Sequence, residues 1–263
     1  MLNFLRSAFV ALCMCMGFAW AAPSGYVHAI SGDVNITEAG KAQVKAKLGD
    51  LFEQGTAFAT GADGKVTLKF SDGQVVALGP NAQFAVTNYV YNPSNVGESN
   101  ILFNLARGSM RFVTGLIGQT NNSKFAVRTP TLTAGVRGTD GEIIIAANGS
   151  VLVTVNSGVV TMTSPSGTVV VTAGNFSFYP PGSDSPSVSN VPLSNLPPEA
   201  AALAQALVAL AQEALPAPNP VSVTQEAQKV IDAAAGTQSS PTPPGTPPAS
   251  TPGGSGGGGG SKS

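Results

Sequence analysis

Residues 129–140, TPTLTAGVRGTD, decide the fold class. The stretch places one proline, two glycines and an arginine inside a β-branched run of four threonines and one valine. β-Branched residues favour strands, whereas proline and glycine interrupt them. The pattern therefore predicts strands interrupted by turns, and not a catalytic loop.

Short strands separated by glycine-bearing turns are predicted on both sides of this stretch, from Ser31 to Tyr179. The clearest is a hairpin: residues 65–70 alternate polar and apolar side chains, Ser71-Asp72-Gly73 turns, and residues 74–78 return. Separate strands are also predicted over residues 150–155, 159–163, 168–172 and 175–179. This regular spacing favours an all-β protein with a rolled or solenoid-like β body, in which each strand pair needs its neighbours to bury its apolar face. A β-sandwich is the alternative, because its strands have similar spacing.

The N-terminal segment, residues 1–22, has the features of a signal peptide. It carries one arginine, then an apolar run, and it finishes at Ala19-Trp20-Ala21, which is typical of a cleavage site. An uncleaved membrane anchor is the alternative. Cys13 and Cys15 lie in this leader and neither follows a small residue, so we expect no lipid attachment and no thiol or disulfide in the mature chain.

The composition changes after the last predicted strand. Residues 181–196 predict a linker, because prolines cannot join a sheet ladder. Residues 197–236 predict a small helical hairpin that covers an open end or edge of the β body, with partner binding as the alternative. Its first helix would carry one apolar stripe, formed by Leu203, Leu207, Leu210 and Ala214. Residues 237–263 consist almost entirely of Gly, Pro, Ser and Thr and predict a disordered tail.

The residue inventory argues against catalysis, metal binding and nucleic-acid binding. The chain has 13 basic and 14 acidic residues, so no basic patch is expected. His28 is its single histidine, and without mature cysteines the usual zinc sites and catalytic triads cannot be assembled. Asp140 and Glu142 resemble an acid/base pair, but no partner is evident, and a surface turn is the preferred interpretation. We therefore expect no enzymatic activity, no cofactor and no metal.

The arginines downstream of the leader are unevenly distributed, because all of them fall between residues 107 and 137. Guanidinium groups bind carboxylates, phosphates and carbonyls through a planar fork of donors. Arg107 and Arg111 are four residues apart and are expected to share one face of a strand. The candidate partner-binding residues are therefore Arg107, Arg111, Arg128 and Arg137, followed by Tyr89 and Tyr91. The alternative is that the arginines brace turns of the fold.

The stretch at 129–140 also resembles the hallmark of the FecR-type domain, in which TP is followed by GVRGT. The resemblance continues upstream through Leu48-Gly49-Asp50, the Asp72-Gly73 turn and residues 105–115. It covers roughly residues 25–145, and residues 146–180 are expected to continue the β body. The resemblance identifies five structural motif positions: Thr129, Pro130, Gly135, Gly138 and Thr139.

FecR-type domains are periplasmic signal-sensing modules of bacterial envelope regulators. Such regulators also contain a cytoplasmic segment that holds a sigma factor and a transmembrane helix. We expect a stand-alone module here, without direct control of a sigma factor. The resemblance implies a periplasmic or secreted bacterial protein that binds an envelope protein or a cell-wall polymer. The alternative is a structural or secreted surface β scaffold without a signalling role.

Overall fold

The computed structural model describes residues 22–120, 124–195, 198 and 200. In this part of the chain, 15 strands form one connected sheet, accompanied by one short α-helix. The prediction of an all-β protein is confirmed. The predicted signal peptide, helical hairpin and tail lie almost wholly outside the described residues.

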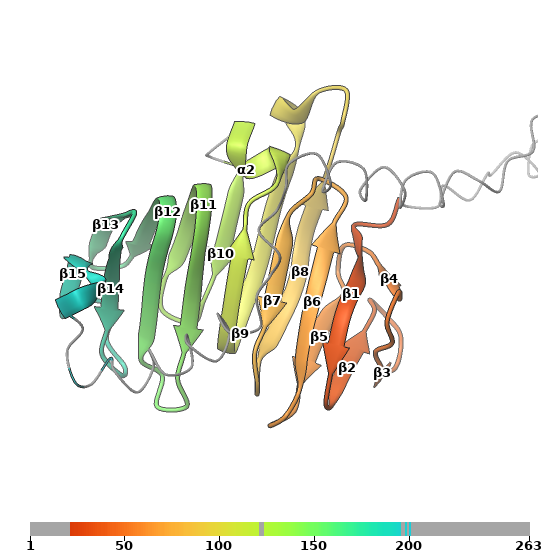
Figure 1. Ribbon diagram of the computed structural model, residues 1–263, viewed down its shortest axis with the longest axis horizontal. Coiled ribbons are helices and arrows are strands. Elements are labelled where there is room, and N and C mark those ends of the chain that lie inside the picture. The colour runs from red at the N-terminus through yellow and green to blue at the C-terminus, as the bar shows by residue number, and fades with distance from the viewer. Residues whose placement is uncertain (1–21, 121–123, 196–197, 199, 201–263) are drawn as a thin grey trace, which may run out of the picture.

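The sheet folds over on itself, so that two layers face each other (Figure 1). Layer 1 contains β4 (Leu51–Phe52), β1 (Gly25–Ser31), β6 (Lys65–Phe70), β7 (Val75–Leu78), β14 (Asn175–Tyr179) and β15 (Val188–Pro192). Layer 2 contains β3 (Val44–Lys45), β2 (Val34–Thr37), β5 (Ala57–Thr60), β8 (Gln83–Val90), β10 (Phe125–Arg128) and β13 (Gly167–Thr172). Short helical elements complete the described part: η1 (Val96–Glu98), α2 (Leu116–Thr120) and η2 (Leu193–Asn195).

Three long strands belong to both layers: β9 (Asn100–Val113), β11 (Thr133–Ile145) and β12 (Val151–Ser164). The first half of β9 pairs with β8 and β10, whereas its second half pairs with β7 and β11. Likewise, β12 pairs with β14 through its first half and with β13 through its second half. One hydrogen-bonded ladder therefore runs through both layers, as in the predicted rolled body, while the two layers face each other as in a sandwich.

Glycines with positive φ mark the points where these strands cross between layers. They are Gly108 in β9 (φ 83°), Gly138 in β11 (φ 56°) and Gly158 in β12 (φ 80°). A Cβ at Gly158 would lie 2.2 Å from the carbonyl oxygen of Gly138, so glycine is needed there for its lack of a side chain as well as for its backbone angle. The turn predicted at residues 156–158 is therefore a bend within one continuous strand, and the two strands expected around it are one.

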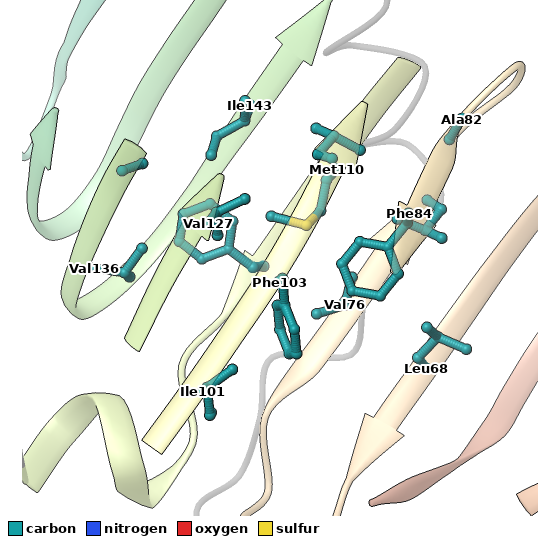
Figure 2. Packing of buried hydrophobic residues seen from close by; sticks show 14 of the residues in the cluster. Leu68, Val76, Ala82, Phe84, Ile101, Phe103, Met110, Val127, Val136 and Ile143 are labelled. Atoms are coloured by element: carbon teal, nitrogen blue, oxygen red, sulfur yellow. The ribbon is translucent and has the colours of Figure 1, made fainter. Parts of the chain in front are cut away.

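The core lies between the layers and is rich in aromatic rings. Phe70 of layer 1 packs against Phe103 of layer 2 with ring centroids 5.0 Å apart, and Phe112 meets Phe125 at 6.0 Å. Figure 2 shows side chains from both layers converging in this interior, among them Met110 of the crossing strand β9. The alternating burial of β6 matches the predicted hairpin, in which residues 65–70 and 75–78 are strands.

The structure adds detail to two other predicted segments, the turn at Thr129 and residues 181–196. Thr129 closes the turn between β10 and β11: its backbone N–H donates to the Leu132 carbonyl at 2.9 Å, and its Oγ1 accepts from the Leu132 N–H at 3.1 Å. The segment predicted as a linker, residues 181–196, contains β15. Val188 and Val191 of this strand pair with Phe178 and Phe176 of β14, and this apolar contact holds the segment in the sheet.

Candidate interaction surfaces

The crossing strands distribute the four candidate arginines over different surfaces. Arg111 lies on the outer face of layer 1, because its neighbours Met110 and Phe112 point into the core. Arg128 and Arg137 lie on the outer face of layer 2, beside the buried Val127 and Val136.

Arg107 is exposed at the crossing of β9, next to Gly108. The expectation that Arg107 and Arg111 share one strand face is wrong. The strand passes from one layer to the other between them, so four residues of sequence spacing do not keep the two side chains on one surface.

Arg111 is held by carboxylates of the neighbouring strand β11. Its Nη2 donates to Asp140 Oδ2 at 3.0 Å and its Nε to Asp140 Oδ1 at 3.3 Å, while Nε lies 3.8 Å from Glu142 Oε1. The Thr154 hydroxyl donates to Glu142 Oε2 at 3.1 Å. The side chain of Arg111 is only 16% exposed, so this two-pronged contact braces the sheet.

The same contacts correct the sequence interpretation of Asp140 and Glu142. Both residues lie within β11 and not in a surface turn, and they have a partner in Arg111. Burial raises the pKa of Glu142, while the Thr154 hydroxyl and the Arg111 charge act in the opposite direction. The sequence could not reveal this partner, because Arg111 and Asp140 are 29 positions apart.

Arg128 and Arg137 belong to an open surface, which we call the arginine face. It is the outer face of layer 2 over β9 to β12 and consists of Asn104, Ala126, Arg128, Thr133, Gly135, Arg137, Thr161 and Thr163. Among the described residues no carboxylate lies on this face, and neither arginine forms an ion pair. The arginine face therefore presents two guanidinium groups to solvent on an otherwise uncharged surface.

Tyr89 is part of the core and not of a surface. It is 8% exposed, packs against Phe70 and bonds through its hydroxyl to Asp72. A bulge between Val86 and Asn88 shifts the alternation of β8 and turns Tyr89 inward. We therefore do not retain Tyr89 as a partner contact. Tyr91 is half-buried against the same core.

A buried polar cluster around Asp72 was not expected from the sequence. The Asp72 carboxylate accepts hydrogen bonds from Gln74 N at 3.2 Å, Tyr89 Oη at 3.1 Å and Ile117 N at 3.4 Å. Burial raises its pKa to about 6, although these hydrogen bonds favour the ionised form. No sequence signal separates Asp72 from an ordinary Asp-Gly turn, because the groups that bury it lie up to 45 positions away.

The described ranges contain no group of three or more His, Cys, Asp or Glu residues that could hold a metal ion. Within the same ranges, no helix is long and apolar enough to cross a membrane.

The two-layered roll is an all-β domain, and part of it matches a known protein family. Residues 56–161 match the family described as FecR protein, so the chain contains a FecR domain. The matched range includes both crossing glycines of β11 and β12 and all four candidate arginines. The FecR domain supports a sensor or regulatory role for this part of the chain.

Solved structures with a similar arrangement include two crystal structures from Parabacteroides distasonis, each described as "a putative anti-sigma factor". The first is 14% identical with a TM-score of 0.43, and the match covers 52% of this chain and 60% of that one. The second is 15% identical with a TM-score of 0.42, covering 51% and 58%. This chain thus spans about 60% of the length of these structures. A search of the curated proteins found no match.

Proposed function

We propose that this protein is an exported, non-enzymatic interaction or sensor module of the bacterial cell envelope, located in the periplasm or secreted. The observation that carries the proposal is the FecR domain at residues 56–161. The signal-peptide features of residues 1–22 support export. The partner is an envelope protein or a cell-wall polymer.

The arginine face is the surface that we assign to this partner. Arg128 and Arg137 are exposed, and within the described chain no carboxylate competes for their donors. A planar guanidinium on an open surface binds a carboxylate or phosphate through two parallel hydrogen bonds. Arg111 is excluded from this role because Asp140 and Glu142 already occupy its donors.

Capture from envelope extract with a double lysine variant tests this assignment. Arg128→Lys with Arg137→Lys keeps both charges but removes the planar forks, so partner capture should fall about tenfold while circular dichroism stays unchanged. Arg107→Lys is the matched control, because Arg107 is exposed but lies at the crossing of β9 and outside the arginine face.

Two outcomes would count against the proposal. Unchanged capture by the double variant would remove the arginine face from partner binding. If no partner is captured even by the wild-type protein, and the protein is released into the medium, the structural scaffold is the better description.

A further inference from the structure

The outer face of layer 1 is covered, unlike that of layer 2. Its apolar side chains are buried although they point away from the core between the layers: Val75, Ala77, Ile144, Leu152, Phe176 and Phe178. In the second half of β11 and the first half of β12, consecutive residues are buried on both faces. Sheets buried on both faces require a second layer of cover.

Some of the residues that cover this face belong to the described part of the chain. Ile144, Leu152, Phe176 and Phe178 form a cluster separate from the main core, and Ala146, Val188 and Val191 pack at its margin. Ala200 belongs to the same cluster and is 0% exposed. The chain therefore returns to this face after β15 and is in contact with it where the described residues end.

The sequence after Ala200 has the apolar spacing of a helix that could cover this face. Pro198 and Ala200 already have α-helical conformation. If the helix continues, Ala200 starts a stripe with spacings of three and four residues that includes Leu203, Leu207, Leu210 and Ala214. The predicted apolar stripe would thus begin at Ala200, a residue that is buried against this face. Pro216 ends the pattern.

The length of such a helix also matches the width of the face. A helix over residues 200–215 would be about 23 Å long at about 1.5 Å per residue. Five neighbouring strands of a sheet are spread over about 19 Å at about 4.8 Å per spacing. A single helix is therefore long enough to reach from the cluster at β14 to Val75 and Ala77 of β7. No helix or strand of the described part covers the face between β6 and β12 (Figure 1).

We propose that residues 200–215 dock as one amphipathic helix on the outer face of layer 1, with the leucine stripe against the sheet. This differs from the sequence expectation, in which the helical segment covers an open end or edge. The docked helix would lie on the face that carries the Arg111 contacts and would leave the arginine face open.

Single tryptophans test this docking in the mature chain. The only tryptophan, Trp20, lies in the leader, so an introduced tryptophan reports on its own surroundings. Leu207→Trp lies on the stripe, and Gln205→Trp, two residues earlier, lies away from it. We expect blue-shifted emission and several-fold weaker acrylamide quenching for Leu207→Trp than for Gln205→Trp.

A destabilising substitution supplies a second readout. Leu207→Asp should increase binding of a hydrophobic dye, because Ile144 and Leu152 lose their cover, whereas Gln205→Asp should not. Equal quenching of the two tryptophans would overturn the proposal. If quenching of Leu207→Trp instead depends on protein concentration, a second copy of the chain covers the face, and the intramolecular docking is refuted.

Discussion

Replacement of Asp72 by asparagine should change how the stability of this protein depends on pH. Asp72 is 2% exposed and has a pKa of about 6, compared with its ordinary 3.8. Below pH 3.8 the group is protonated in the folded and the unfolded chain, and it carries no ionisation penalty. Between pH 3.8 and about 6 the carboxyl ionises in the unfolded chain but stays protonated in the folded chain, so the folded state loses stability relative to the unfolded state. The loss levels off above about pH 6, where the buried carboxyl ionises as well.

The difference between the two pKa values sets the magnitude. At about 1.4 kcal/mol per pH unit, a rise from 3.8 to about 6 corresponds to about 3 kcal/mol. Part of this total is already lost at pH 4, above the unfolded pKa of 3.8, so the free energy of unfolding should fall by about 2 kcal/mol between pH 4 and pH 7 because of this one group. Glu142 acts in the same direction, since burial raises its pKa as well.

The asparagine variant cannot ionise, so its unfolding free energy should lack this fall. At pH 4 it should be less stable than wild type by about 1 kcal/mol, because its amide group cannot accept all three hydrogen bonds of the carboxyl. At pH 7 it should be as stable as wild type or more stable. Urea unfolding followed by circular dichroism between pH 4 and pH 7 measures both differences.

Two related variants sharpen this test. Tyr89→Phe removes a hydrogen bond that favours the ionised form of Asp72, so the fall in stability should begin at the same pH and extend to higher pH. Asp63→Asn is the matched control, because it replaces an exposed carboxylate in the turn between β5 and β6. If wild type and Asp72→Asn lose stability in parallel over this pH range, the buried carboxyl is not its cause.

Three other measurements follow from the structure. Gly138→Val should lower the free energy of unfolding by about 2 kcal/mol through backbone strain alone. Gly158→Val should lower it further, because its Cβ would also strike the Gly138 carbonyl. Equal losses for the two variants in urea unfolding would contradict this difference. Arg111→Ala should cost about 3 kcal/mol in the same assay, because it leaves the buried Glu142 without its cation, and a loss below about 1 kcal/mol would show that the contact is not a brace. N-terminal sequencing of the exported protein should give a start near Ala22 or Pro23, and a full-length chain found only in membranes would refute cleavage.

The hairpin at residues 65–78 could be predicted because its information is local. Alternation of polar and apolar residues fixes which side of a strand is buried, and an Asp-Gly turn fixes where the chain reverses. The crossing of β12 between layers has no comparable local signature. At Gly158 the strand continues in a new direction, and a glycine inside a valine-rich run reads equally well as a turn.

The arginines show that local sequence patterns also fail to identify the functional surface. Their uneven distribution along the chain is visible in the sequence, but the assignment of each to a brace or to an open surface depends on strand register. Register places Arg111 opposite Glu142, and it places Arg128 opposite Thr133, where no carboxylate is available. Long-range pairings of this kind are determined by the fold, and residue spacing alone gave the wrong face for Arg107 and Arg111.

The contrast between the two outer faces explains why partner binding is assigned to layer 2. Two neighbouring strand segments of layer 1 are buried on both sides, with Ile144 and Leu152 on the outer side. This face is therefore stable in water only when it is covered, and any partner would compete with that cover. The arginine face consists of small polar side chains and two exposed guanidinium groups, and it tolerates solvent without cover. A surface that is stable when empty can bind and release a partner without exposing core residues. This property suits a sensor, and it is the physical reason to direct the first binding experiments to Arg128 and Arg137.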